Sequence, residues 1–166
     1  MIRKLALIFA TTFVAGLLFV NIYNSIVDAP SWGSNFPASI QTTRDYFKIV
    51  NPGNFFRVFS PINQVLSLLA LIVCWKVNRR VRMYCALALI FAVASDAFTF
   101  AYFYPRNEIM FHSPIDTNLE GIKTAWSQWS SMNWLRSGIG AVNLFFDFVA
   151  LTLLLKNDPW RKQGSS

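Results

Sequence analysis

Four long apolar runs constrain the fold of this chain more than any other feature. They cover residues 5–27, 59–75, 83–104 and 135–155. Each is close to the ~20 residues that a helix needs to cross a hydrocarbon core of ~30 Å. Such continuous runs differ from the alternating ~10-residue strands of a membrane barrel, and a bilayer offers no water to unpaired backbone groups. The sequence therefore predicts one all-α domain over residues 1–166, an integral membrane four-helix bundle.

The composition agrees with a membrane protein and excludes other classes. Of the 166 residues, 54% are hydrophobic, 16% are aromatic and only 14% are charged, whereas roughly 25% of an average soluble domain is charged. So many aromatic residues also exclude a disordered chain. The 15 Lys and Arg residues exceed the 8 acidic residues. They occur in short blocks between apolar runs, so they indicate membrane orientation and not nucleic-acid binding.

The positions of the basic residues predict the orientation of the bundle. One group precedes the first run, fills the connector after the second or follows the fourth: Arg3, Lys4, Lys76, Arg79, Arg80, Arg82, Lys156, Arg161 and Lys162. The long connectors, residues 28–58 and 105–134, hold fewer cations, and acidic residues dilute them. By the positive-inside rule, both termini are cytoplasmic and the long connectors lie outside, as in a multi-pass protein of a bacterial inner membrane.

The long connectors are expected to contain short helices. Apolar residues within 37–52 predict a short helix that lies on the bundle or in the membrane interface. In the second connector, Asp116 or Thr117 is expected to cap a helix that continues into the fourth span, with Glu120 as the capping-box partner of Thr117.

The first run exceeds the ~7–15 apolar residues typical of a signal peptide, which favours a retained span over a cleaved leader.

Metal and cofactor chemistry is not expected. A single histidine, His112, cannot build a haem with two axial histidines, a di-iron bundle or a copper site of several imidazoles. Cys74 and Cys85 lack the C-x-x-C spacing of a disulfide relay and are interpreted as buried bystander thiols. The sequence also lacks phosphate-loop, dinucleotide-binding and zinc motifs.

Polar residues inside the spans are the most informative, because a charge at mid-membrane costs about 2.5–3.5 kcal/mol on insertion scales. Spaced three or four residues apart, they form one stripe on each helix, and such stripes are expected to face one another. The stripes are Asn21, Asn24 and Asp28; Ser60, Asn63, Gln64 and Ser67; Ser95, Asp96, Thr99 and Tyr102; and Trp126, Trp129, Asn133, Arg136, Gly140, Asn143 and Asp147.

The stripes coincide in depth and predict a polar pocket in the outer half of the bundle. Asp96 and Arg136 are expected to be charged partners there, because each is expensive to leave alone. The alternative is that such groups only hold helices together by interhelical hydrogen bonds, and for Asn63, Gln64 and Asn143 both interpretations stay open. Asp147 lies deeper and is either a packing partner of the cytoplasmic cations or a proton site.

The residues before the fourth span resemble a known family. They form the pattern Trp-x-x-Trp-x-x-x-Asn-x-x-Arg over residues 126–136, preceded by Pro105-Arg106-Asn107 and by an Asn51-Pro52 turn before the second span. With the four spans, this pattern is similar to the anthrone-oxygenase-like family of small bacterial and fungal membrane proteins, and the resemblance covers nearly the whole chain. After Asn107, Glu-Ile-Met-Phe-His replaces the family's usual run of small residues.

The resemblance implies oxidation of a phenolic tricyclic ketone to a quinone by O₂, without metal or flavin. A base would remove an acidic C–H proton beside a carbonyl, and the electron-rich anion would reduce O₂ directly. The residues implied are Asp96 or His112 as the base, Arg136 and Asn133 as oxyanion partners, and Trp126, Trp129, Tyr102 and Phe103 as the aromatic slot. Asn21, Asn24, Asp28 and Asn63 complete the expected binding surface.

Two functional hypotheses follow. The first is a membrane-embedded redox enzyme or a protein that binds small aromatic compounds in the outer pocket; it requires a cavity of several hundred Å³ near Asn133. The second is a non-catalytic accessory subunit or lipid-binding module in which the stripes serve assembly. The expected partners are membrane lipid, a small aromatic or quinone ligand, and further copies or a larger membrane complex, but not nucleic acid.

Overall fold

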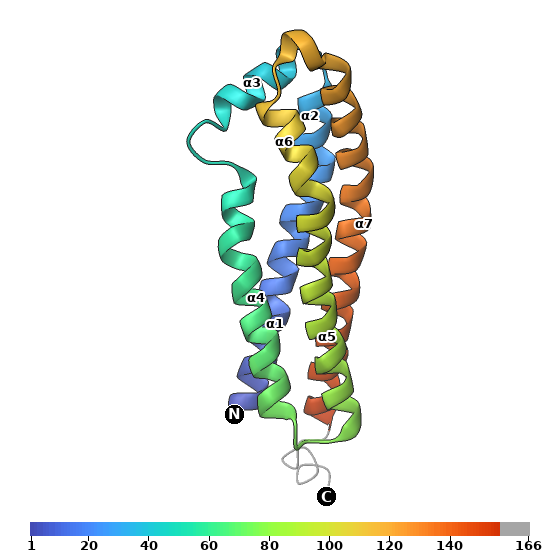
Figure 1. Cartoon of the computed structure of the whole chain (residues 1–166). Coiled ribbons are helices and arrows are strands. Elements are labelled where there is room, and N and C mark those ends of the chain that lie inside the picture. Colours follow the sequence, from blue (N-terminus) through green and yellow to red (C-terminus); the bar gives the residue numbers. More distant parts are fainter. Residues whose placement is uncertain (157–166) are drawn as a thin grey trace, which may run out of the picture.

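The protein is a bundle of long helices in a computed structural model that describes residues 1–156 (Figure 1). Its elements are α1 (Ile2–Tyr23), the π-helical turn η1 (Asn24–Asp28), α2 (Ala29–Gly33), α3 (Ala38–Tyr46), α4 (Pro52–Cys74), α5 (Arg79–Phe98), the π-helical turn η2 (Thr99–Phe103), α6 (Tyr104–His112) and α7 (Ile115–Lys156). No strand occurs in these 156 residues, which confirms the all-α prediction. Arg161 and Lys162 lie outside the described residues.

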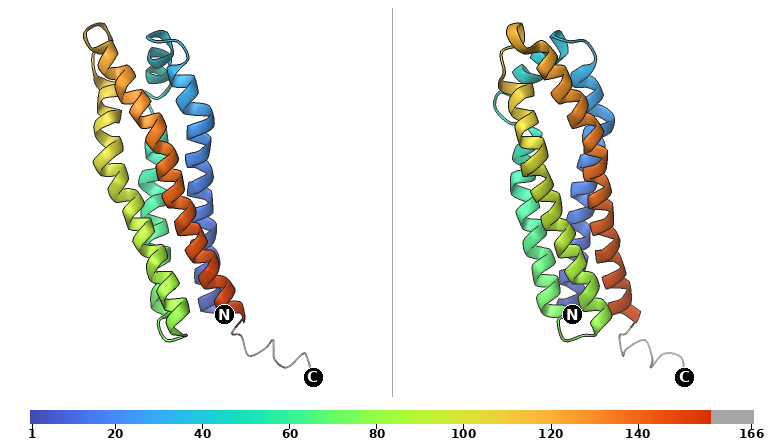
Figure 2. Two further views of the ribbon diagram at one scale, coloured as in Figure 1. Left: turned by 90° about the vertical axis from the view of Figure 1, so that its right-hand side faces the viewer. Right: turned by 45° about the vertical axis from the view of Figure 1, so that its right-hand side comes forward.

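Four helical rods are long and apolar enough to cross a membrane: Ile2–Gly33, Pro52–Cys74, Arg79–His112 and Ile115–Lys156. This confirms the number of predicted spans. Contacts join α1 to α4, α4 to α5, α5 to α7 and α7 to α1, so α4 and α7 occupy opposite corners of the bundle (Figure 2). The N-terminus and the end of α7 share one end, here called the terminal end, and the connectors α2, α3 and α6 cover the other, here called the loop end (Figure 1).

The rods extend beyond the apolar runs from which the spans were predicted. The second span begins at Pro52 and not near residue 59, because Asn51 and Asn54 cap the helix and the Asn54 side chain accepts a hydrogen bond from the Asn51 backbone N–H at 2.9 Å. At a rise of about 1.5 Å per residue, α4 is about 35 Å long and matches a bilayer. The other three rods are longer and extend beyond the start of α4 at the loop end (Figure 1).

Two prolines that follow the predicted first and third spans lie inside continuous rods. Pro30 and Pro105 each come two residues after a π-helical turn, η1 and η2. A proline cannot donate to the carbonyl four residues earlier, and its ring clashes with that carbonyl in a regular α-helix. The wider π turn before each proline moves this carbonyl aside, so the helix continues past the proline and into the loop end.

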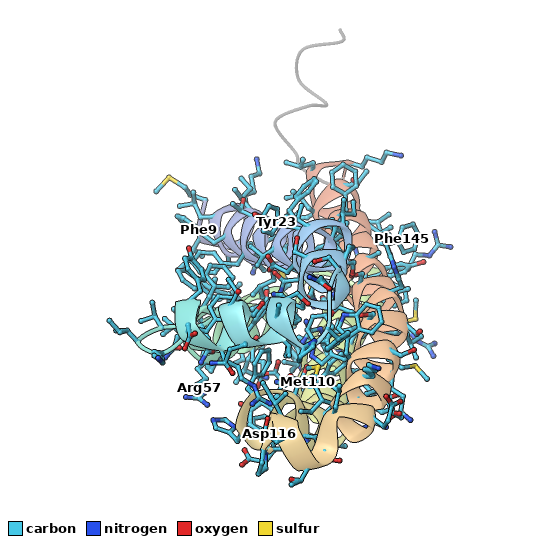
Figure 3. The ribbon with its side chains drawn as sticks, turned by 90° about the horizontal axis from the view of Figure 1, so that it is seen from above. Phe9, Tyr23, Arg57, Met110, Asp116 and Phe145 are labelled. Carbon is cyan, nitrogen blue, oxygen red and sulfur yellow. The ribbon has the colours of Figure 1, made fainter. Side chains whose placement is uncertain are left out.

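Two apolar clusters occupy the two ends of the interior. The terminal cluster consists of Leu7, Ala10, Ala70, Cys74, Val81, Cys85, Ala150 and Leu154. The cap cluster at the loop end consists of Ala29, Trp32, Ile40, Phe103, Met110, Ile122, Ala125 and Trp129. Seen from the loop end, Met110 lies within the bundle, whereas Phe9, Tyr23 and Phe145 point outward, as expected for lipid-facing residues (Figure 3).

The short helix predicted within residues 37–52 is α3, and it lies on the cap cluster through the buried side chain of Ile40. Arg44 fixes α3 to α6, because its Nε donates to the Met110 carbonyl at 2.9 Å and its Nη2 donates to the same oxygen. Partial burial lowers the pKa of the Arg44 guanidinium from its usual range. α3 is therefore part of the lid over the bundle.

The capping prediction for the last helix was wrong. α7 runs through the second connector into the fourth span as expected, but Asn118 has non-helical backbone angles, and the helix changes direction there. The Glu120 carboxylate accepts a hydrogen bond from Lys123 at 2.8 Å instead of closing a capping box with Thr117. A nearby cation on the same helix face competes successfully for an exposed carboxylate.

Candidate functional site

The interior between the two apolar clusters is polar. Its buried polar side chains are Asn21, Asn24, Ser25, Asn63, Ser67, Asn133, Arg136, Ser137, Asn143 and Asp147. We call these residues the polar layer. The predicted stripes of α1, α4 and α7 therefore do face the bundle interior, and Asp96 of α5 lies half-buried at its edge.

The register of α4 against α7 places the members of this layer at matching depths. The two helices run in the same direction, and the Arg136 guanidinium lies 5.1 Å from the Phe56 ring centroid. Continuing along both helices from this contact brings Asn63 level with Asn143 and Ser67 level with Asp147, because both helices rise equally per residue. The polar layer thus continues from Arg136 toward the middle of the bundle.

Arg136 lies in an aromatic cage. Its guanidinium carbon is 4.4 Å from the Phe103 ring centroid, 5.1 Å from Phe56 and 5.7 Å from Trp129, and the residue is only 5% exposed. Its Nε is buried and has no hydrogen-bond acceptor. Cation–π contacts stabilise a cation in such surroundings, but they do not satisfy its N–H donors. Arg136 therefore keeps unused donors in a desolvated, aromatic environment.

The expected direct pairing of Arg136 with Asp96 does not occur. Ion pairs with both partners in residues 1–156 join Lys48 to Asp45, His112 to Glu108 and Lys123 to Glu120, all on the surface. Asp96 instead accepts a hydrogen bond from Gln64 Nε2 at 2.6 Å, and Arg136 is near enough only for a longer-range attraction. The reason is geometric: the guanidinium lies among the rings of Phe56, Phe103 and Trp129, while the carboxylate is held by Gln64, eight residues further along α4 than Phe56.

Asn133 connects α7 to α1. Its Nδ2 donates to the Asn21 carbonyl at 3.0 Å and to the Ser25 hydroxyl at 2.6 Å. The Asn21 carbonyl lies just before η1, where the wider turn disturbs the regular helical hydrogen bonds and leaves room for a second donor. The Asn133 Oδ1 is buried without a donor. The nitrogen of this amide thus joins two helices, whereas its oxygen has no partner.

The other predicted α1 residues stabilise the same region. With its amide nitrogen turned toward the acceptors, Asn24 donates to Asp28 at 2.8 Å and to the Val20 carbonyl at 3.2 Å. Asp28 is half-buried. These contacts lie within the α1 rod, so Asn24 and Asp28 are close to Asn133 but are engaged with each other.

The predicted aromatic residues divide between the cage and the cap. Trp129 contacts Trp32 with ring centroids 5.0 Å apart, and its Nε1 is buried without an acceptor. Trp126 donates through Nε1 to the Ala29 carbonyl at 2.7 Å and fixes α2 to α7. Tyr102 lies beneath Arg106, whose guanidinium carbon is 3.4 Å from the Tyr102 ring centroid. Only Trp129 and Phe103 among the predicted slot residues contact Arg136.

His112 is not brought to the polar layer. It lies at the exposed end of α6, and its Nδ1 is 3.2 Å from the Glu108 carboxylate. Of the two predicted bases, only Asp96 lies near Arg136.

The sequence analysis did not identify Phe56, which closes the cage from α4. Its spacing of four residues before Ser60, on the polar face of that helix, is the signal that could have identified it.

Asp147 is the deepest charged residue of the polar layer. At about 1.5 Å per residue it lies about 13 Å from the end of α7, near the middle of a bilayer, whereas Arg136 lies about 30 Å from that end. Asp147 is 0% exposed, and both carboxylate oxygens lack a hydrogen-bond partner. The Asn143 Oδ1 and Ser67 Oγ atoms also lack partners. Asp147 forms no hydrogen bond or ion pair with any basic residue in the described part of the chain.

Outside the polar layer, the described residues include two cysteines and an open groove. Cys74 and Cys85 are both free and buried within the terminal cluster. No group of three or more His, Cys, Asp or Glu residues that could hold a metal occurs in residues 1–156. An open groove of about 340 Å³ lies at the terminal end and is lined by Arg3, Ile72, Val73, Trp75 and Lys76. It lies away from Asn133, so it is not the cavity that the first hypothesis requires there.

Comparisons of the chain with protein-family models, with curated proteins and with solved structures find no match. The resemblance to anthrone-oxygenase-like proteins therefore stays a prediction from the sequence. The function is inferred below from the chemistry of the polar layer and its aromatic cage.

Proposed function

We propose that this integral membrane protein binds a planar aromatic anion, such as a phenolate or the enolate of an aromatic ketone, beside Arg136 and promotes its oxidation by O₂. The single observation that supports the proposal most is the cage around Arg136. A buried guanidinium among Phe56, Phe103 and Trp129, with an unused Nε donor, offers both a positive charge and flat apolar walls. A planar anion is the class of ligand that uses both.

The residues around Arg136 suit the reaction. Asp96 is a nearby carboxylate that can accept a proton from an acidic C–H group, and Gln64 holds it in place. Arg136 can stabilise the oxyanion that develops on the ligand. In the proposed overall reaction, a methylene carbon beside the aromatic ring loses two hydrogens and gains one oxygen from O₂ as a carbonyl. The second oxygen leaves as water, so O₂ is the electron acceptor.

Ligand binding and O₂ consumption test this proposal together. The purified protein in detergent is titrated with anthrone, a hydroquinone and a simple phenol, each paired with its O-methyl ether, and tryptophan fluorescence is followed because Trp129 lies in the cage. We expect the phenols to bind more tightly as they ionise, and the ethers to bind weakly. An oxygen electrode should record uptake with anthrone, and Asp96→Asn should slow it about 10²-fold or more.

The same experiment separates this proposal from the alternative, a non-catalytic accessory or lipid-binding protein. That alternative has its own support, because the Asn133 amide joins α7 to α1 and because the open groove of the bundle lies away from Asn133. Equal binding of phenols and ethers would show that Arg136 does not recognise the charge. Tight binding without O₂ uptake would leave a binding protein and contradict the proposed oxidation.

We also propose that the terminal end faces the cytoplasm, in a bacterial inner membrane. The support is the group of cations at that end, among them Arg3, Lys76, Arg79 and Arg80. Cysteine labelling tests the orientation: a membrane-impermeant maleimide should label Ser34→Cys in intact cells and Arg80→Cys only after lysis. Cys74 and Cys85 are buried and should contribute little background. The reverse pattern would contradict the proposed topology.

A further inference from the structure

We propose that the groove at the terminal end binds the headgroup of an anionic phospholipid. The groove, about 340 Å³ in volume, lies between the start of α1 and the end of α4 and is lined by Arg3, Ile72, Val73, Trp75 and Lys76. It is at the opposite end of the bundle from Arg136, so it does not depend on the aromatic ligand. Two of its five lining residues are cations, and none is acidic. This charge favours an anion.

The guanidinium of Arg3 is held at the groove. Its Nε donates to the Val73 carbonyl at 3.0 Å, which is one of the last carbonyls of α4 and lacks a partner within that helix. A guanidinium has five N–H donors, so this bond leaves its terminal nitrogens for another acceptor. Lys76, in the turn after α4, adds a second positive charge at the groove. A phosphodiester can accept hydrogen bonds from both.

An apolar wall beside the groove indicates that the anion carries hydrocarbon chains. Ile72 lines the groove and is 58% exposed, and Val65 and Leu69 continue the same exposed surface along α4. The half-exposed Trp75 ring lies where an aromatic residue prefers the boundary between headgroups and chains. Arg82 holds this ring, since its guanidinium carbon is 5.0 Å from the ring centroid. A phospholipid matches both the cationic groove and this wall.

A zwitterionic lipid fits less well. Its quaternary ammonium would lie among the cations of Arg3 and Lys76, and no acidic residue of the groove would balance it. A lipid such as phosphatidylglycerol carries the phosphate without that cation. The proposal therefore specifies a net negative headgroup.

Native mass spectrometry of the purified protein tests this proposal. The protein is mixed in detergent with equal amounts of phosphatidylglycerol and phosphatidylcholine, and the retained lipids are counted. We expect one phosphatidylglycerol to be retained in preference. The double variant Arg3→Gln/Lys76→Gln should lose this retention by about tenfold or more, because two cations near the lipid phosphate are removed.

The matched control is Arg79→Gln/Arg80→Gln, which removes two exposed cations at the same end but outside the groove. Its retention should stay within about twofold of the unmodified protein. If the double variant in the groove does not fold, Arg3→Gln and Lys76→Gln are compared singly, and each should lose retention severalfold.

Three results would overturn the proposal. Equal retention of the two lipids would show no preference for the anion. An equal loss in the control variant would show general attraction to a basic surface. Inorganic phosphate that raises the thermal unfolding temperature as much as phosphatidylglycerol would show that the groove binds free anions and not a lipid.

Discussion

Arg136→Leu is expected to lower the affinity for a phenolate about 100-fold or more while the unfolding temperature stays equal or rises. Hydrogen bonds to a charged partner contribute about 1.5–3 kcal/mol each, and about 1.4 kcal/mol corresponds to tenfold in affinity. The protein itself should tolerate the change, because the buried guanidinium has no carboxylate at ion-pairing distance in residues 1–156 and its Nε is unsatisfied. Replacing such a charge by an apolar side chain is often neutral or stabilising.

Two further variants make the Arg136 measurement specific. Arg136→Lys keeps the charge but loses the planar group that fits among the rings, so an intermediate affinity is expected. Arg106→Leu removes another arginine with an aromatic contact, which bonds the Gln128 side chain and the Tyr102 carbonyl outside the cage. It should leave phenolate affinity unchanged. If Arg106→Leu weakens binding as much as Arg136→Leu, the cage is not the binding site.

Asp147→Leu is expected to raise the free energy of unfolding by about 1–3 kcal/mol. Both carboxylate oxygens are buried without a partner, and a buried polar group without a hydrogen bond costs about that amount. Leucine has a similar size and removes the cost. Unfolding in mixed micelles, with denaturing detergent as the variable and helix content as the signal, measures the difference.

The control for Asp147 is the neighbouring Phe148, which is exposed on the outer face of α7. Phe148→Leu should change stability little, because this side chain faces lipid. A loss of stability in Asp147→Leu would show that the carboxylate has an interhelical role, as in the accessory interpretation. A gain would show that the protein keeps a costly group at mid-membrane, which is the usual sign of a functional residue.

The sequence predicted the membrane-spanning fold well because lipid imposes a simple rule. Continuous apolar runs must be helical, so the four spans and the inward-facing polar stripes were predictable from residue types alone. The residues at which the helical rods end could not be predicted from residue types. Pro30 and Pro105 normally stop helices, and whether a widened turn lets a helix continue depends on tertiary contacts such as the bond from Trp126 to the Ala29 carbonyl.

The sequence predicted most residues of the candidate site but not which of them contact one another. Arg136 and Asp96 were expected together because charges in a membrane usually pair. The structure instead surrounds Arg136 with aromatic rings and gives Asp96 a hydrogen bond from Gln64. Helical spacing gives the face on which a side chain lies. It does not tell which of several neighbours on other helices lies nearest, so the spacing of Phe56 places it on the polar face of α4 but does not show its contact with Arg136. The exposed position of His112 could not be derived either.

The π-helical turns η1 and η2 determine where the length of this chain can vary. Each π turn holds one residue more than a regular turn, so removing one residue from it narrows it to an ordinary α turn. A deletion at Ile26 or Phe100, both exposed within these turns, would therefore return a carbonyl to the place where the ring of Pro30 or Pro105 clashes with it. The connection at residues 47–51 lies between helices and carries no such constraint. Natural insertions and deletions should therefore accumulate in that connection and be absent from both turns.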